Sequence, residues 1–385
     1  MTGSTDSDRH QASGKGMLRE GFTTGSAAAA AAAAALRLIL KKTRPPAVNI
    51  PLPPFSDGRE RARLDIHIAE YAVPDSCPDT DDAEQARAVI VKDGGDDPDA
   101  TSHARIYADV TFRKDDCATS SSVEIEGGRG VGRVTLPGLP IAVGEAAINP
   151  APREQICAAV REVCSEAQSF GRVRVVIGVE NGEELARHTL NARLGILGGI
   201  SILGTQGIVK PFSHAAWKAS IEQALKVALA SGTGSAVFST GRRSEKLLIR
   251  EFPELPESAF VQAADFAAFS LRSAGKMGFS KIAWGCFFGK LAKLAQGLEY
   301  THAREAPLDM QRLAQTASDA GVKNADRIAL CNTANQALDI LLDAENGDRA
   351  VQRVAEKAKK QAAAFAGMPV HILLFHTDGR LLTAV

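Results

Sequence analysis

Nine consecutive alanines, Ala27 to Ala35, constrain the fold of this chain more than any other feature. The run is barely hydrophobic, and it continues without a break into Leu36, Leu38 and Ile39. It therefore lacks the Leu-rich stretch and the cleavage site of a secretory signal. Because the side chains are so small, another backbone or a flat ligand can approach such a helix closely. We predict a tightly packed internal helix.

Composition limits the class of protein. A chain of 385 residues is long enough for two domains. Its 45 Lys and Arg residues balance 45 Asp and Glu residues, so no long-range field attracts it to nucleic acid or to an anionic membrane. Six cysteines without a CxxC pair are typical of reduced thiols. We predict a cytoplasmic protein that binds neither nucleic acid nor membrane and has no metal site.

The first half of the chain predicts an α+β domain. Residues 1–16 are polar and aperiodic, which predicts a disordered tail. Residues 17–232 then combine the alanine helix with Gly-rich ligand loops and several strand-like stretches. A helix over 211–231 ends this domain. The strand-like stretches are 64–68, 88–91, 105–112 and 172–179.

Residues 233–385 predict a smaller α/β domain. Short apolar runs at 235–238, 259–262 and 281–284 alternate with helix-compatible segments, as in a mostly parallel sheet. The terminal run 370–375 completes a sheet of about four strands. A helical insertion is predicted between Pro307 and about Ala366.

Two segments of the first domain are candidates for binding charged ligands. At the start of the alanine helix, small hydroxyl residues and a glycine leave first-turn N–H groups for a carboxylate or phosphate, although an ordinary helix cap is the alternative. These residues are Thr23, Thr24, Gly25 and Ser26. The second segment is an acidic loop that could hold hydroxyls or a cationic group, or could be a solvated turn. Its candidates are Lys92, Asp93, Asp96, Asp97 and Asp99.

Glycine-rich segments supply further candidates. Bare backbone N–H groups beside arginines suit anions, but residues 128–133 complete neither a dinucleotide fingerprint nor a P-loop, and a flexible hairpin is the alternative. The strip 194–208 places five glycines among aliphatic residues, so a ligand or another backbone is expected against it, with bulged strands as the alternative. The candidates in these segments and in the turn before the helix near Pro152 are Gly128, Gly130, Gly132, Arg133, Asn149, Arg153, Gly198, Gly199, Ser201, Gly204 and Thr205.

The second domain has two candidate turns. Thr240, Gly241 and Arg242 follow its first predicted strand, and residues 285–290 follow its third. Open α/β sheets bind ligands at the carboxyl ends of such strands, whereas ordinary βα turns are the alternative. No Ser-His-Asp, Cys-His or zinc set is evident, so the catalytic residue is left unknown.

Seven segments together resemble one known family. They are GFTTGSAAAAAAAAAL at 21–36, VKDGGDDPDAT at 91–101, GGRGVGRVTLPGL at 127–139, GEAAINPAPR at 144–153, LGILGGISILGTQGIVKPFS at 194–213, STGR at 239–242 and GKLAKLAQG at 289–297. In this order they resemble the CbiD family of cobalt-precorrin-5B C1-methyltransferases. The chain departs from the family pattern at 264–268, where it has ADFAA, and at Ala27 and Cys286.

The resemblance implies a specific reaction. S-adenosyl-L-methionine would donate a methyl group to C1 of a cobalt-precorrin tetrapyrrole, giving cobalt-precorrin-6A in the anaerobic route of cobalamin biosynthesis, with cobalt only as part of the substrate. Arg129, Arg133, Arg153, Lys210 and the turn at 23–26 would bind substrate carboxylates, and the acidic loop would bind donor hydroxyls or the donor amino group.

Two other functions stay open at this point. A small-molecule kinase also uses Gly-rich phosphate loops, and a tetrapyrrole carrier needs no chemistry. Homo-oligomer formation, and which domain holds the donor, are also left open.

Overall fold

A computed structural model describes residues 18–55, 62–73 and 83–385. The predicted tail at 1–16 lies outside these residues. The fold is mixed α/β with several sheets, and it divides into two compact units. The N-terminal unit contains the residues up to Gly130 together with 148–185 and 202–212, and the C-terminal unit contains 131–147, 186–201 and 213–385.

The N-terminal unit is built on a five-stranded sheet in the order β4-β5-β6-β10-β7. All neighbouring strands are antiparallel except β10 and β7, which are parallel. Three of the four stretches predicted as strands match β5, β6 and β10, and the fourth, 64–68, overlaps the strand β3 (Arg63–His67). The strands are β4 (Glu70–Ala72), β5 (Glu84–Val91), β6 (Arg105–Lys114), β7 (Ser122–Gly127) and β10 (Gly171–Val179).

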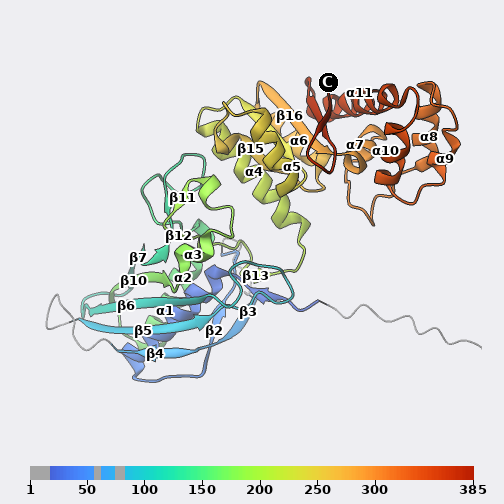
Figure 1. The fold of residues 1–385 in the computed structure, drawn as a ribbon. Helices are drawn as coiled ribbons and strands as arrows, with labels where there is room; N and C mark the ends of the chain where they lie inside the picture. The colour runs from blue at the N-terminus through green and yellow to red at the C-terminus, as the bar shows by residue number, and fades with distance from the viewer. Residues whose placement is uncertain (1–17, 56–61, 74–82) are drawn as a thin grey trace, which may run out of the picture. The chain divides into compact units, whose positions relative to one another are not determined.

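The alanine run lies inside α1 (Thr24–Lys41), in the core of this unit. Figure 1 shows α1 lying against the sheet, where it packs on β5 and β6. It also packs against α2 (Pro150–Ala167) and against β2 (Ala47–Pro51), which pairs antiparallel with β3 (Arg63–His67). Each alanine of the run is at most 1% exposed. A helix apolar on all sides must be buried in this way, so the predicted internal helix is confirmed.

Length and composition alone would also allow α1 to cross a membrane. Its 18 residues have a mean hydropathy of 1.2, but 83% of them are buried inside the structure. Its packing on four neighbouring elements identifies α1 as a core helix of this unit.

The C-terminal unit contains a five-stranded sheet in the order β15-β14-β16-β17-β18. The first four strands are parallel and correspond to the four predicted strands. The fifth, β18, was not predicted; it returns antiparallel to β17 after a short turn. The strands are β14 (Ser235–Ser239), β15 (Phe260–Gln262), β16 (Lys281–Phe287), β17 (His371–Phe375) and β18 (Leu381–Ala384).

Helices cover both faces of this sheet. On one face, α5 (Arg242–Glu251) packs Leu247 and Leu248 against side chains of β14, β16 and β17. On the other face, α4 (His214–Ala230), α6 (Ala267–Met277), α7 (Phe288–Ala295) and α11 (Gly347–Ala366) share a core with Phe238 and Trp284. The predicted insertion adds α8 (Met310–Asp319), α9 (Asp326–Ala329) and α10 (Ala334–Leu342) before α11.

The sequence places α4 at the end of the first domain, whereas the structure packs it in the C-terminal unit. Its buried residues Ile221 and Leu225 belong to the core of that unit, because the apolar face of α4 contacts α6 and β15. Residues 131–147 and 186–201 also join this unit. It is therefore larger than a domain that begins at residue 233.

Short elements form the remaining segments. In the N-terminal unit, β1 (Gly21–Phe22) pairs with β13 (Ile208–Val209), and in the C-terminal unit β9 (Arg133–Val134) pairs with β11 (Ile196–Leu197). The others are β8 (Gly130–Val131), β12 (Gly199–Ile200), α3 (Gly182–Ala186) and the 3₁₀ turns Ala192–Leu194 and Glu257–Ala259.

Candidate functional site

The start of α1 is closed by the chain itself. The Thr23 hydroxyl accepts the N–H of Ser26 at 3.2 Å, and the N–H of Gly25 donates to the Leu203 carbonyl at 3.1 Å. Gly204 has φ +134°, and a Cβ there would lie 2.5 Å from the side chain of Thr23. The structure therefore brings residues 23–26 together with Leu203 and Gly204, as a packed junction in which Thr23, Thr24 and Ser26 are buried.

Three carboxylates of the acidic loop bind neighbouring parts of the same unit. Asp93 pairs with the guanidinium of Arg19, and Asp96 accepts the backbone N–H of Arg19 at 2.7 Å. Asp97 accepts the backbone N–H of Phe212 at 2.9 Å. The bonds from Arg19 and from the backbone hold the pKa of Asp93 below its usual value. These contacts tie the segments before α1 and after β13 to the loop.

The fourth carboxylate of the loop, Asp99, has a buried partner. Its Oδ2 lies 2.5 Å from Nζ of Lys92, whose side chain is only 1% exposed. The hydroxyl and N–H of Thr101 also donate to Asp99, each at 2.7 Å. Burial raises the pKa of Asp99, but the ammonium and the bonds from Thr101 outweigh burial and hold this pKa below its usual value.

At several glycines predicted to bind a ligand, another segment of the chain packs closely instead. Gly130 has φ +77°, and a Cβ there would lie 2.0 Å from the carbonyl oxygen of Val179. A Cβ on Gly128 would meet Val176 at 2.9 Å. In the C-terminal unit, a Cβ on Gly132 would lie 2.8 Å from the carbonyl of Gly199. These glycines permit close approaches between chain segments.

The middle of the glycine strip is more open. Gly198 has φ +81° and no atom within 4 Å of its Cβ position. Beside it, the amide of Asn191 donates to the carbonyl of Gly199 at 3.0 Å and accepts the hydroxyl of Ser201 at 3.2 Å. The strip thus forms short strands held by Asn191.

The predicted anion-pairing arginines of these segments bond to carbonyl groups. Arg133 donates to the carbonyl of Gly144 at 3.0 Å. Arg153 donates to the carbonyls of residues 148 and 125, at 3.0 and 3.1 Å. Asn149 precedes α2, and its N–H donates to the carbonyl of residue 202.

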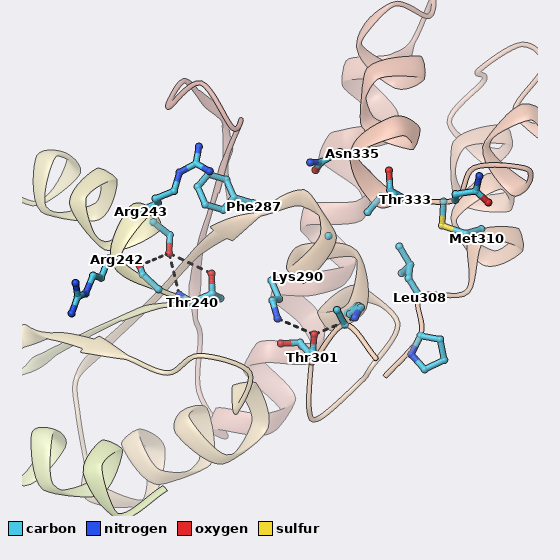
Figure 2. Close-up of a pocket in the computed structure, with 18 residues that line it drawn as sticks. Thr240, Arg242, Arg243, Phe287, Lys290, Thr301, Leu308, Met310, Thr333 and Asn335 are labelled. Carbon is cyan, nitrogen blue, oxygen red and sulfur yellow. Dashed lines mark hydrogen bonds between the residues drawn. The ribbon is translucent and has the colours of Figure 1, made fainter. Parts of the chain in front are cut away.

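A cavity of about 780 Å³ opens where β14 and β16 end, within the C-terminal unit (Figure 2). One wall comes from the turns after these strands, and the other comes from the helical insertion. Of the predicted site residues, Thr240, Gly241 and Arg242 line it. The sheet-side wall also contains Arg243, Ser244, Phe287, Gly289, Lys290, Lys293 and Thr301, and the insertion-side wall contains Ala303, Pro307, Leu308, Met310, Asn332, Thr333, Ala334 and Asn335.

Three helices begin at this cavity. The residues that precede α5, α7 and α10 are Gly241, Phe287 and Thr333, and all three line it. No side chain caps α5. The turn before α5 is held instead by Ser244, whose hydroxyl accepts the N–H of Thr240 at 3.1 Å and donates to the carbonyl of Gly241 at 3.0 Å. Helix N-termini carry partial positive charge and free N–H groups, so this arrangement favours anions.

The charged side chains that line the cavity are all cationic. Arg242 is exposed, and it has no ion-pair partner in the part of the chain that the structure describes. Arg243 donates to the carbonyl of Thr377 at 2.7 Å and lies over the ring of Phe287. Lys290 and Lys293 complete the set, and no Asp or Glu is among the described residues that line the cavity.

The two lysines lie on one face of α7. Lys290 pairs with Asp265 and also donates to the carbonyl of Thr301 at 3.0 Å. Lys293 is 8% exposed and donates to the carbonyls of Thr301 and His302, at 3.1 and 3.0 Å. Burial, together with the charge of Lys293, lowers the pKa of Lys290 to about 8. Burial also lowers the pKa of Lys293.

Sequence reasoning did not single out the insertion-side wall or Lys293. The signal for the lysines was present, since they stand three residues apart just after a predicted strand, a spacing that places them on one helix face.

Comparisons with known proteins agree over most of the chain. The CbiD family profile matches residues 10–211, and the profile "CbiD, C-terminal domain" matches residues 300–385. The cobalt-precorrin-5B C(1)-methyltransferase of Nitratidesulfovibrio vulgaris is 52% identical over 371 residues, which cover 95% of this chain and 92% of that protein. The chain belongs to the CbiD family.

A second curated relative and a solved structure extend the comparison. The protein of the same name from Geobacillus kaustophilus is 47% identical over 332 residues, covering 86% of this chain and 84% of its own. A crystal structure of the cobalamin biosynthesis protein (cbiD) from Archaeoglobus fulgidus is 26% identical, covers 71% of this chain and 78% of its own, and has a TM-score of 0.36.

Proposed function

We propose that this chain methylates C1 of cobalt-precorrin-5B, giving cobalt-precorrin-6A in the anaerobic route of cobalamin biosynthesis. The observation that carries the proposal is the 52% identity, over 95% of the chain, to a protein named for this reaction. Two further relatives, whose matches cover 86% and 96% of this chain, have the same name. These names do not favour a kinase or a non-catalytic carrier.

S-adenosyl-L-methionine is the proposed methyl donor. Its sulfonium carbon is already activated, so an electron pair of the ring carbon forms the new C–C bond while the C–S bond breaks and a neutral thioether leaves. The protein then chiefly has to align the two reactants and exclude water. This reaction requires no Ser-His-Asp or Cys-His set, and cobalt enters only as part of the substrate.

The cavity of the C-terminal unit supports this substrate class. Its volume is typical of small-molecule sites, and it lies at the carboxyl ends of parallel strands, where open α/β sheets bind ligands. The described residues that line it include four cations and the residues before three helices, and none of them is acidic. A tetrapyrrole with acetate and propionate side chains matches these groups. We further propose that the enzyme acts in the cytoplasm, with α1 buried in its own unit.

The test is a single incubation. Purified protein is mixed with S-adenosyl-L-methionine and cobalt-precorrin-5B, and mass spectrometry follows the tetrapyrrole. One added methyl group, with an equal amount of S-adenosylhomocysteine, is the expected result. A tetrapyrrole that binds but keeps its mass would support the carrier, and magnesium-dependent ATP consumption would support the kinase. Either result would overturn the proposal.

A further inference from the structure

We propose that the cavity of the C-terminal unit holds the carboxylated tetrapyrrole and not the methyl donor, and that Arg242, Lys290 and Lys293 bind its carboxylates. This inference rests on the proposed function, because it assigns one of that reaction's two ligands to a place.

Charge separates the two ligands. The donor carries a cationic sulfonium, an ammonium group and a single carboxylate, so it is net positive, and its ribose presents hydroxyls that need acceptors. Within the described part of the chain, the lining of the cavity provides no carboxylate for the sulfonium, the ammonium group or the hydroxyls. Asp265 forms an ion pair with Lys290. Its charge does not neutralise Arg242, Arg243 or Lys293. A cationic ligand would be repelled here, and a polycarboxylate would be attracted.

The buried lysine lacks an anion. Lys293 is more than nine-tenths buried, yet among the residues that the structure describes its ammonium group contacts the carbonyl oxygens of Thr301 and His302 and no carboxylate. A buried charge is stable only when it is well paired. A carboxylate in the cavity would supply the missing partner and would favour the charged form of both lysines.

The two walls suit a flat ring with a charged rim. Figure 2 shows Arg242, Arg243 and Thr240 on one side, with Leu308 and Met310 on the other. The first side offers donors for carboxylates. The second side offers apolar surface for the face of a macrocycle, since Leu and Met side chains gain from contact with apolar groups. Lys290 and Thr301 lie between the two sides in Figure 2.

Two substitutions test the assignment without disturbing the core. Arg242→Gln removes an exposed cation that has no ion-pair partner among the described residues. Asn335→Asp adds a negative charge on the opposite wall, in the first turn of α10, where an acidic residue stabilises a helix. Lys246→Gln is the matched control, because Lys246 is an exposed cation of α5 that does not line the cavity.

Each variant is titrated separately with cobalt-precorrin-5B, followed by visible absorption, and with S-adenosylhomocysteine, followed by calorimetry. We expect both cavity variants to raise the Kd for the tetrapyrrole about tenfold or more. Arg242→Gln loses a charge-assisted hydrogen bond, and Asn335→Asp places a carboxylate near the carboxylates of the ligand. The Kd for S-adenosylhomocysteine should stay within about twofold, and Lys246→Gln should change neither value. Unchanged thermal unfolding confirms that the variants fold.

Two outcomes would overturn the assignment. One is weaker S-adenosylhomocysteine binding with tetrapyrrole binding intact, which would place the donor in the cavity. The other is no change in either Kd. The proposed function fails separately, when the unmodified protein binds the tetrapyrrole but transfers no methyl group to it.

Discussion

The buried ion pair between Lys92 and Asp99 leads to the most demanding prediction. If this pair holds the acidic loop in place, Asp99→Asn will lower the free energy of unfolding much more than the loss of a surface carboxylate would. The substitution keeps the shape of the side chain but leaves an ammonium group, 1% exposed, without its anion. Removing one partner of a buried pair costs about 3–5 kcal/mol of unfolding free energy.

That free energy can be converted to a melting temperature. At roughly 2–4 °C for each kcal/mol in a domain of this size, Asp99→Asn should lower the Tm by about 6–20 °C. Lys92→Met should cost less, because Asp99 is 21% exposed and keeps its bonds from Thr101. The double substitution removes both charges and should lie within about 1–2 kcal/mol of the unmodified protein.

The assay is thermal and urea unfolding of the three variants, followed by circular dichroism. Asp116→Asn is the control, since Asp116 and its partner Lys114 are exposed and such pairs contribute at most about 1 kcal/mol. Because the pKa of Asp99 is lowered in the folded state, its contribution is present at neutral pH and is lost as the pH falls through that pKa. A Tm for Asp99→Asn no lower than that of the control would refute the reasoning.

Three further predictions concern a close backbone contact, a lysine of the cavity and the order in which two cysteines react. Gly275→Ala should lower the free energy of unfolding by about 3 kcal/mol, because the new Cβ would lie 1.8 Å from a carbonyl oxygen of α11. Urea unfolding measures this loss. In the control Gly289→Ala the nearest atom would lie 3.4 Å from the new Cβ, so its free energy of unfolding should be no lower than that of the unmodified protein. Affinity for the tetrapyrrole should fall as the pH rises through about 8, where Lys290 loses its charge, and a flat profile from pH 7 to 9 would contradict this role. Iodoacetamide should label exposed Cys117 long before buried Cys286, whose pKa is raised to about 12; peptide mass mapping at several times would reveal the opposite order.

Much of the fold follows from local sequence pattern. The apolar runs marked the four parallel strands of the C-terminal sheet because buried strands are short and continuous in hydrophobicity. By contrast, β18 was missed, since Leu381–Ala384 is short and only partly buried. The unit to which α4 belongs could not be predicted either, because an amphipathic helix shows that it packs but not against what.

The candidate site was predicted in part for a similar reason. The rule for carboxyl ends of parallel strands located Thr240, Gly241 and Arg242 beside the cavity. Met310, Thr333 and Asn335 belong to the helical insertion, far along the chain from residues 240–242. They line the cavity because of the way the insertion folds back, which local sequence pattern does not reveal. Gly130 and Gly204 have the residue type that a ligand cradle needs, but their close neighbours are protein atoms. Sequence alone does not distinguish these two uses of a glycine.

The uniform surface of α1 has one more consequence. Every turn of the alanine run presents the same methyl groups, so a screw displacement along the helix axis would change its packing very little. The position of the helix must then be set at its two ends. Thr23 and Ser26 anchor the first turn, and Arg37 and Lys41 both bind Glu166 of α2 near the last. These contacts at the two ends therefore fix the position of α1 along its own axis.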